Sequence, residues 1–556
     1  CTFMTSEKTK DGNFSWGREY SSLFWQDDLG RYSIGDQYFM PIVRNVPTFP
    51  EGDVKLFSTW VSEASEAYDF SNTFGISKPV ISPFEVSYKY SKKEKKISDY
   101  LVNFAKERNL EVVQDKALNV LIKKEATKGY ENFSPLILQG HMDMVWEKNK
   151  NTNFDFENCG IELVVKDGFL TANGTTLGAD NGIAVAMALA ILDSDKISHP
   201  ALEVILTTDE EEGMSGVNNL DFSLFSGKTL INLDTEEYGQ VYVSSAGGAR
   251  IENELDLQKK DCESDDTIFS IEVKGLNGGH SGAEIHLGLG NSNKILNEVL
   301  YHLNKRYFME LIDFDGGDKT NAIPREAISL ISVKLDEPGH RLEELANLAF
   351  KNILADFGVI DKNPVLEIKK IDNVKNFKKI STADTNRVLS FLHEFPNGVI
   401  STSKDIEDLV ETSINLGVVK SQDFDNELKI KIHSLPRSSV NHSLENLIKE
   451  IEELCKKYDV KMKVSAPYPS WEYRKDSKIR ELMVNSFKKI NNSEPEIKAI
   501  HAGLECGIFD ANMDVDITSI GPNIYGAHTP EERMEISSVG KTWNLLLTVL
   551  KDYNIK

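Results

Sequence analysis

A histidine and an aspartate lie two positions apart in the segment Gln-Gly-His-Met-Asp-Met at 139–144. His141 and Asp143 directly follow Leu136–Gln139, which is predicted to form a buried strand. Residues two apart in an extended segment point the same way. Asp143 could therefore accept the proton of one ring nitrogen of His141 while the other nitrogen binds a metal ion. Short motifs also arise by chance, so the pair could equally be a surface histidine and aspartate.

Carboxylates recur at two further places along the chain. Asp180 lies in Leu-Gly-Ala-Asp-Asn-Gly, before an apolar segment, where it could bind a metal ion or simply cap a helix. The run Asp-Glu-Glu-Glu at 209–212 follows the β-rich stretch Glu203–Thr207. Adjacent carboxylates repel one another, and a divalent cation would relieve the repulsion if they converge. One glutamate could then bind metal while its neighbour takes a proton from water; otherwise the run is a solvated acidic turn.

Asp234 and His528 complete the candidate set. Asp234 ends the β-rich run Thr229–Leu233, and His528 lies in Gly-Ala-His-Thr-Pro after the run Val515–Ile520. His528 alone could be an ordinary loop histidine. However, every group in the set follows a strand or opens a helix, and ligands bind outside the carboxyl ends of strands in open α/β sheets. If the strands share one sheet, the histidines and carboxylates converge into a site suited to two zinc ions, or to manganese.

The apolar pattern predicts the elements that would position these residues. Strands alternate with helices such as Gly182–Leu192, which is apolar nearly all round and is therefore expected to be buried. This predicts an α/β catalytic domain, a mixed sheet with helices on both faces, built from 81–260 and 466–556. An inserted α+β domain is predicted for 261–465, and 1–80 form an extra N-terminal segment without clear periodicity.

Ser91 and Glu94 have the spacing of a capping box, so the first helix of the catalytic domain is expected to begin there. The apolar residues that follow fall on one helical face. They are Ile97, Leu101, Phe104 and Ala105.

Composition narrows the class of protein. The 556 residues carry a net charge of -24, which argues against nucleic acid or an anionic membrane as the main partner. The five cysteines are scattered, so a disulfide framework is not expected and a reducing compartment fits better. No apolar run approaches the ~18 residues of a membrane span. We expect a cytoplasmic protein.

Several longer strings carry a family resemblance. They extend from about residue 85 to the end and resemble aminoacyl-histidine (Xaa-His) dipeptidases, within the co-catalytic zinc aminopeptidase and carboxypeptidase clan. The strings are QGHMDMVWEKN, GTTLGADNGIAVAMALAIL, LINLDTEEYGQVYVSSAGG, GLNGGHSGAEIHLGLGN, NAIPREA, HAGLECGIF and SIGPNIYGAHTPEERMEISSVG.

The resemblance implies metal-dependent hydrolysis of dipeptides, with two divalent ions, zinc or else manganese or cobalt, as cofactors. Asp180 would bridge the ions. The remaining roles would be His141 and Asp234 on one ion, Glu211 and His528 on the other, Glu210 as general base, and Asp143 orienting His141. The family also implies a cis peptide between Asp180 and Asn181.

The inserted domain would be a lid and the contact of a homodimer. His280 in Gly-Gly-His-Ser-Gly, Asn321 and Arg437 match positions near the substrate. His280 could instead only complete a glycine-rich turn, and Arg437 could be a surface ion-pair residue.

The first residues resemble a different family. Residues 1–22 are similar to the start of choloylglycine-hydrolase-type amidases, in which an N-terminal cysteine is the nucleophile and its free amine the base. A bifunctional protein with a Cys1 amidase activity is therefore one alternative. Others are an aminoacylase-type amidohydrolase of the same clan and a non-catalytic binding protein.

Overall fold

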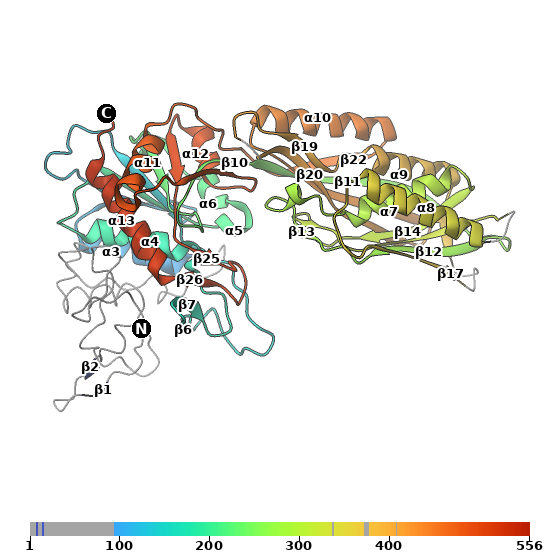
Figure 1. Cartoon of the computed structure of the whole chain (residues 1–556), viewed down its shortest axis with the longest axis horizontal. Coiled ribbons are helices and arrows are strands. Elements are labelled where there is room, and N and C mark those ends of the chain that lie inside the picture. Colours follow the sequence, from blue (N-terminus) through green and yellow to red (C-terminus); the bar gives the residue numbers. More distant parts are fainter. Residues whose placement is uncertain (1–6, 9–13, 16–93, 336–338, 372–376, 407–408) are drawn as a thin grey trace. The chain divides into compact units, whose positions relative to one another are not determined.

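The computed structural model describes residues 7–8, 14–15, 94–335, 339–371, 377–406 and 409–556 (Figure 1). Cys1 and most of the predicted N-terminal segment, 1–80, lie outside this range. The chain divides into two compact units. Unit 1 comprises the chain up to Val243, Arg474–Lys498 and Ile508–Lys556, whereas unit 2 comprises Ser244–Tyr473 and Ala499–Gly507.

An eight-stranded mixed sheet forms the centre of unit 1, in the order β23-β10-β24-β9-β5-β8-β4-β3. Strands β24, β9, β5 and β8 are parallel, while β10 pairs antiparallel with β24, β4 with β8, and β3 with β4. The mixed α/β fold is thus confirmed. The strands are β3 Glu111–Gln114, β4 Val120–Lys124, β5 Leu136–His141, β8 Leu202–Thr207, β9 Thr229–Asn232, β10 Gln240–Ser245, β23 Glu496–Ile500 and β24 Asp516–Ser519.

A second sheet of unit 1 has four strands in the order β25-β26-β7-β6, which are Ile524–Tyr525, Arg533–Glu535, Phe169–Ala172 and Leu163–Lys166. The helices of this unit are α3 Lys95–Glu107, α4 Ala179–Asp193, α5 Glu210–Gly213, α6 Ser215–Asn218, α11 Lys478–Asn491, α13 Ile536–Asp552 and the 3-10 turn η3 Phe222–Leu224. Helix α12, Cys506–Asn512, begins in unit 2 and continues into unit 1.

Helix α4 lies against β5 in the core of unit 1. Its side chains are buried on all sides, as the apolar pattern predicts. Asp180 and Asn181 have non-helical dihedral angles, φ -83°, ψ 105° and φ -117°, ψ 32°, and the peptide bond between them is cis. The regular helix therefore follows these two residues and presents them at its amino-terminal end.

Helix α3 corrects the predicted capping box. Its N-cap is Glu94, which makes no side-chain bond to the start of the helix. The Glu94 carboxylate instead accepts a hydrogen bond from the backbone N–H of Asp209, at 3.2 Å. Ser91 lies outside the described residues. The Glu94 carboxylate, which the capping-box pattern assigns to the start of α3, is thus bound to a backbone N–H far along the chain.

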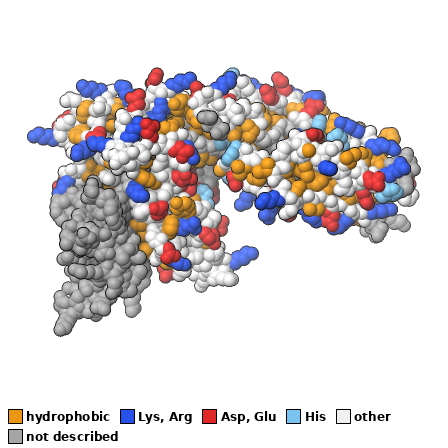
Figure 2. Space-filling model, viewed as in Figure 1, with side chains coloured by type: hydrophobic (Ala, Val, Ile, Leu, Met, Phe, Trp, Pro, Cys, Tyr) orange, Lys and Arg blue, Asp and Glu red, His pale blue; other side chains and the backbone are white. Residues whose placement is uncertain are grey.

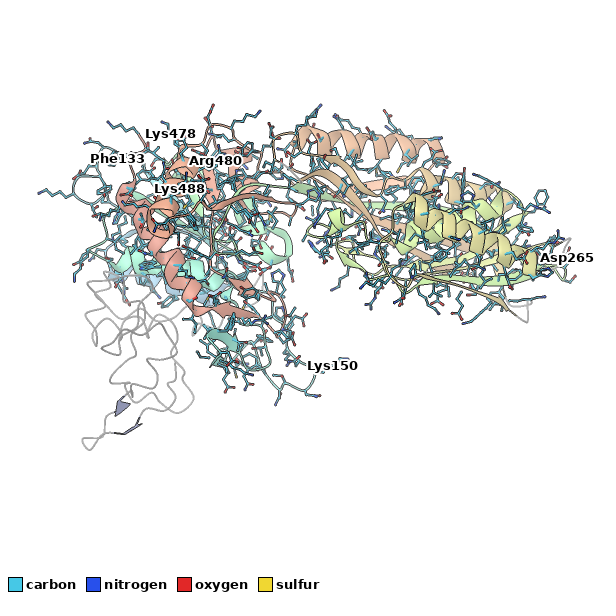
Figure 3. All side chains as sticks on the ribbon, in the orientation of Figure 1. Phe133, Lys150, Asp265, Lys478, Arg480 and Lys488 are labelled. Carbon is cyan, nitrogen blue, oxygen red and sulfur yellow. The ribbon has the colours of Figure 1, made fainter. Side chains whose placement is uncertain are left out.

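The last residues of the described chain pack against the segment before β5. The backbone N–H of Ser134, just before β5, donates to the carbonyl of Ile555 at 2.9 Å. Phe133, labelled in Figure 3, makes an edge contact with buried Tyr553, with ring centroids 6.4 Å apart. Together these contacts bind the C-terminal residues to the segment that leads into the central strand.

Unit 2 is built on a ten-stranded sheet with the path β17-β12-β16-β14-β20-β21-β11-β18; β19 pairs with β20 and β22 with β11. The strands are β11 Gly247–Asp261, β12 Thr267–Lys274, β14 Met309–Gly316, β16 Ala327–Val333, β17 Val365–Ile371, β18 Lys378–Ile380, β19 Gly398–Thr402, β20 Val410–Phe424, β21 Glu427–Ser438 and β22 Lys461–Tyr468. Strand β11 begins at Gly247 and belongs wholly to this sheet. Unit 2 therefore starts before residue 261, where the inserted domain was predicted to begin.

Four helices share one apolar core with the large sheet of unit 2. They are α7 Ser292–Asn304, α8 His340–Asp356, α9 Thr382–Glu394 and α10 Asn441–Tyr458. A small sheet joins β13, Gly279–His280, to β15, Ala322–Ile323, and the 3-10 turn η4 spans Ile285–Leu287. In this small sheet His280 lies opposite Ala322.

Charged side chains of both signs lie side by side over the face of the molecule drawn in Figure 2. Acidic residues outnumber basic ones, 87 Asp and Glu against 63 Lys and Arg. Among the described residues, no helix has the length and apolar character that a membrane crossing requires.

Candidate metal centre

The predicted ligands come together at the carboxyl ends of the parallel strands of unit 1. His141 ends β5, Glu211 follows β8 on α5, and Asp234 follows β9. Asp180 is supplied by the start of α4, and His528 by the loop between β25 and β26. The carboxyl edge of a parallel sheet is where such folds bind ligands, so the topology accounts for this convergence.

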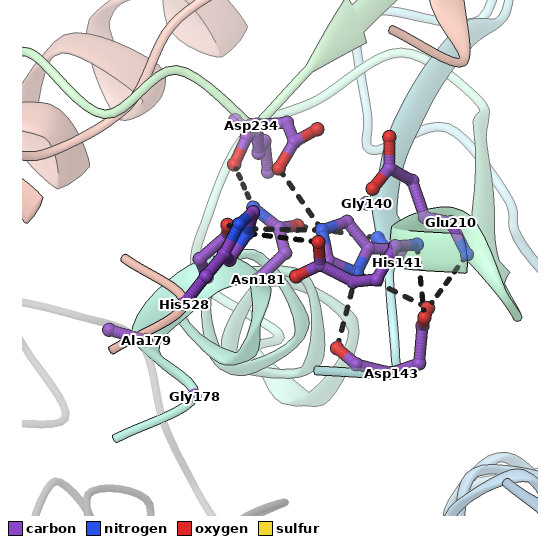
Figure 4. A network of polar contacts seen from close by, with 12 residues as sticks. Gly140, His141, Asp143, Gly178, Ala179, Asn181, Glu210, Asp234 and His528 are labelled. Carbon is purple, nitrogen blue, oxygen red and sulfur yellow. Dashed lines mark hydrogen bonds and ion pairs between the residues drawn. The ribbon is translucent and has the colours of Figure 1, made fainter. Parts of the chain in front are cut away.

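The His141 ring is held from both sides (Figure 4). Its Nε2 atom lies 3.0 Å from Oδ1 of Asp180 and 3.3 Å from Oδ1 of Asp234. Its Nδ1 atom lies 3.3 Å from Oδ1 of Asp143. Asp143 and the Asp180–Asp234 pair therefore face different ring nitrogens, which leaves Nε2 directed into the cluster.

His528 reaches the cluster from the loop between β25 and β26. Its Nε2 atom lies 3.2 Å from Oδ2 of Asp180 and 2.9 Å from Oε2 of Glu211. The two carboxylate oxygens of Asp180 thus face two different histidines. The backbone of His528 is left-handed, with φ 65°, a conformation that histidine adopts more readily than most residues.

Three groups of side chains could each hold a metal ion, since their ligand atoms all lie within 4.8 Å of one another. Asp180 belongs to two of them, and so does His141, which links the groups into one centre. The groups are His141, Asp180 and Asp234; Asp180, Glu211 and His528; and His141, Glu210 and Glu211.

Asp143 connects the histidine to the acidic segment. Its side chain is fully buried, and its two oxygens accept the backbone N–H groups of Glu210 at 3.1 Å and Glu211 at 3.2 Å. One carboxylate therefore fixes both the His141 ring and the start of α5. This arrangement orients the two glutamates without using their side chains.

Burial and mutual repulsion raise the pKa values of several carboxyl groups in and beside the centre. Burial, together with the charge of Asp180, raises the pKa of Glu211 to about 7 and that of Glu236 to about 8. Burial is also the main cause that raises the pKa of Asp234. Carboxylates that are costly to ionise together favour a site for a cation.

The two histidines respond in the opposite direction. Burial disfavours the charged form of His528, but its bonds with Asp180 and Glu211 outweigh this and raise its pKa to about 11. Burial likewise opposes the charge on His141, yet Asp234 and its other carboxylate partners hold its pKa well above the usual value. Both shifts favour the protonated imidazole, so metal binding would have to displace these protons.

The donor set fits divalent metal ions. Imidazole nitrogens and carboxylate oxygens are ligands for zinc and manganese. The Oε1 atom of Glu211 is buried and has no hydrogen-bond partner among the described residues. A buried carboxylate oxygen without a donor is costly, and a metal ion would satisfy it.

Asn181 ties the ligand-bearing segments together. Its Oδ1 atom accepts the backbone N–H of His141 at 3.3 Å, and its Nδ2 atom donates to the carbonyl of Leu233 at 2.9 Å. A methyl group on Gly140 would lie 2.6 Å from both Oδ1 of Asn181 and Cβ of Ala184. Only glycine therefore allows α4 to approach β5 this closely.

We expect Gly140→Ala to lower the free energy of unfolding by about 1–3 kcal/mol, because α4 must move away from β5. The same shift should weaken metal binding through the displaced Asn181. Thermal unfolding and metal titration measure the two effects. Gly339→Ala is the control, since a methyl group there meets only ordinary contacts of 3.5 Å and 3.7 Å. Equal behaviour of the two variants would contradict this account.

The three predicted substrate contacts lie near one another in unit 2. A methyl group on Gly282 would be 3.1 Å from Cε1 of His280 and 3.4 Å from Nε of Arg437. The carbonyl of Asn321 accepts the backbone N–H of Ser281 at 2.9 Å. Arg437 is buried and donates to the hydroxyl of Tyr468 at 2.9 Å, so it is not a surface ion-pair residue.

Two residues that contact the centre do not follow from the sequence patterns. Asn181 acts through its carboxamide, and Glu532 is a buried carboxylate that accepts backbone N–H groups at the start of α4. The signal for Glu532 is slight: an acidic residue four positions after His528. Hydrogen bonds to backbone donors impose no spacing that a sequence pattern would reveal.

Comparison with known proteins places the chain in a family. Residues 137–552 match the family described as peptidase family M20/M25/M40. The chain is 38% identical over 464 residues to the cytosol non-specific dipeptidase of Escherichia coli (strain K12), which covers 83% of this chain and 94% of the relative.

Solved structures agree with this match. The aminoacylhistidine dipeptidase of Vibrio alginolyticus is similar with a TM-score of 0.78 and 34% identity, covering 85% of this chain and 96% of the other. The aminopeptidase PepT of Bacillus cereus shares the fold, with a TM-score of 0.53, 16% identity and coverage of 86% and 96%. Since the family match spans most of the chain and includes every proposed metal ligand, the chain belongs to peptidase family M20/M25/M40.

Proposed function

We propose that this protein is a metal-dependent dipeptidase with a preference for Xaa-His substrates. The observation that carries the proposal is the pair of ligand groups that share Asp180, because a shared carboxylate is how a protein brings two metal ions together. Support comes from the relatives in Escherichia coli and Vibrio alginolyticus, whose names describe dipeptidases. A cytoplasmic location, as the name of the Escherichia coli relative indicates for that protein, is part of the proposal.

His141 and Asp234 would hold one ion, Glu211 and His528 the other, and Asp180 both. Zinc fits this donor set, and manganese or cobalt would also be accepted. When bound, the ions supply Lewis acidity, which lowers the pKa of water and polarises a carbonyl. Asp143 keeps the Nε2 atom of His141 available by engaging Nδ1.

Glu210 is assigned as the general base. It opens α5 beside Glu211, Asp143 accepts its backbone N–H at 3.1 Å, and it belongs to neither of the candidate metal groups that share Asp180. A carboxylate beside the centre that does not hold metal can accept a proton from the attacking water and then donate it to the leaving amine. Glu211, buried and in contact with His528, is better suited to bind metal.

His280, Asn321 and Arg437 are proposed substrate contacts, and unit 2 is proposed to form a homodimer. The shared position of His280 and Arg437 around Gly282 supports a common role for them. Sedimentation of the full chain tests the dimer. The kinetics of the Arg437→Lys variant test the proposed contact between Arg437 and the substrate. If the contact exists, the variant should have a higher KM for dipeptides and a small change in kcat.

Removal of metal should abolish hydrolysis. We expect the full chain to cleave a panel of dipeptides, fastest with histidine at the C-terminal position, and to lose this activity on treatment with a chelator. Adding back zinc, manganese or cobalt should restore it. Turnover that survives complete chelation would contradict the proposal, as would the absence of cleavage of every dipeptide in every metal.

The same assay separates the alternatives. An aminoacylase-type enzyme would cleave N-acyl amino acids and leave dipeptides intact. A Cys1 amidase would be inactivated by thiol alkylation and would resist the chelator. A binding protein would take up metal ions and hydrolyse none of these substrates.

A further inference from the structure

Glu532 lies four residues after His528 and is buried, with 2% of its surface exposed. Its carboxylate accepts four consecutive backbone N–H groups. Oε2 accepts those of Leu177 at 2.7 Å and Gly178 at 2.9 Å, and Oε1 accepts those of Ala179 at 2.8 Å and Asp180 at 3.4 Å. The last of these donors belongs to the residue that faces both histidines.

The local backbone is shaped to receive a carboxylate. The first N–H groups of a helix have no partner within the helix, and consecutive amides around a left-handed residue form a concave anion site. Gly178 supplies the left-handed residue, with φ 71° and ψ 28°. A side chain there would be strained by the left-handed backbone, and a methyl group would lie 2.6 Å from Sδ of Met144.

The segment that carries Glu532 also carries His528. The backbone N–H of Thr529 donates to the carbonyl of Gly526 at 3.2 Å, and that of Glu532 donates to the carbonyl of Thr529 at 3.0 Å. These turns set the distance between the histidine and the carboxylate. A single short segment therefore contacts Asp180 twice, once at its side chain through His528 and once at its backbone through Glu532.

We propose that Glu532 is a positioning residue that holds the backbone of 177–180, and thereby the Asp180 carboxylate, in place for two metal ions before they bind. This inference rests on the proposed metal-dependent function. Asn181 completes the arrangement on the far side of Asp180, through its bonds to His141 and Leu233. Asp180 is thus fixed by neighbours on both sides that do not themselves ligate metal.

A purely structural role would look different. If Glu532 served only to satisfy the amino terminus of α4, its loss would lower stability and leave metal affinity unchanged. Glu203 provides the matched control. It is equally buried, lies in the same unit, and accepts the backbone N–H groups of Ser226 at 3.0 Å and Gly227 at 2.9 Å, away from the metal ligands.

The test compares Glu532→Gln with Glu203→Gln in the full chain. Each change keeps the shape of the side chain but turns an amide N–H₂ toward backbone donors. Zinc is titrated into the metal-free proteins against a competing chelator, and the cobalt-loaded proteins are examined by visible absorption. We expect Glu532→Gln to bind metal about 10- to 100-fold more weakly and to show an altered cobalt spectrum. Glu203→Gln should keep both wild-type values despite a lower unfolding temperature.

Wild-type metal affinity and spectrum in Glu532→Gln would overturn the inference, and so would an equal loss of affinity in Glu203→Gln. If Glu532→Gln does not fold, hydrogen exchange of metal-free wild-type protein decides. Strong protection of the amides of 177–180 supports the inference, and rapid exchange there overturns it. A wild-type protein that binds no metal would instead refute the proposed function itself.

Discussion

Replacing Glu210 by glutamine should lower kcat for dipeptide hydrolysis by about 10²- to 10⁴-fold, the contribution of a well-placed general base. The amide cannot accept the proton of the attacking water, so the chemical step slows. Metal binding should stay close to wild type, because Glu210 belongs to neither group that shares Asp180, and the other two members of its own group, His141 and Glu211, each belong to one of those groups. Saturation kinetics, together with metal analysis of the purified variant, measures both quantities.

Glu212→Gln is the control for this prediction. Glu212 has the same side chain in the same short helix, but it is exposed and belongs to none of the candidate metal groups. Its turnover should remain near wild type. Near-normal turnover in Glu210→Gln would remove Glu210 from the mechanism. Loss of both metal ions in that variant would make it a ligand instead.

Replacing Asp180 by asparagine should remove both metal ions and, with them, measurable hydrolysis. Asp180 contributes one oxygen toward His141 at 3.0 Å and the other toward His528 at 3.2 Å, so both ligand groups lose a member at once. We expect the affinity for metal to fall by more than about 100-fold, since outer partners of ligands alone cost up to that much. Metal titration with a competing chelator measures this loss.

Asp193→Asn separates metal loss from general damage to the same helix. Asp193 closes the carboxyl end of α4 and forms a buried ion pair with Arg108, 2.6 Å between Nε and Oδ1. Breaking a buried pair costs about 3–5 kcal/mol of stability. This variant should unfold at a lower temperature yet bind two ions. If Asp180→Asn retained both ions, the shared role of Asp180 would be refuted.

The sequence predicted that the candidate ligands would lie together, because each of them ends a strand or opens a helix. Buried strands such as Leu136–His141 are recognisable from apolar runs, and a carboxylate or histidine directly after them must lie at the sheet edge. The order of strands was not predictable in this way. It depends on pairs such as β24 with β9, whose residues lie far apart along the chain.

Hydrogen bonds from side-chain carboxylates to distant backbone N–H groups could not be predicted from the sequence, for a different reason. Glu94 was expected to cap α3, but its carboxylate accepts the N–H of Asp209 instead. Glu532 likewise contacts amides more than three hundred residues earlier in the chain. Such bonds depend on where loops meet in space, and no periodicity or composition records them.

The position of His528 after unit 2 in the chain has a consequence for biosynthesis. A ribosome releases Asp180, Glu211 and Asp234 first, then the whole of unit 2, and only afterwards the strand β24 that pairs with β9 and the loop that carries His528. A chain that stops before this loop therefore holds every carboxylate of the candidate metal groups. It lacks His528 of one group and Glu532, which binds the backbone N–H groups of 177–180. Peptidase activity would thus begin only after the segment with His528 and Glu532 has been synthesised, and chains that stop before this segment would be inert.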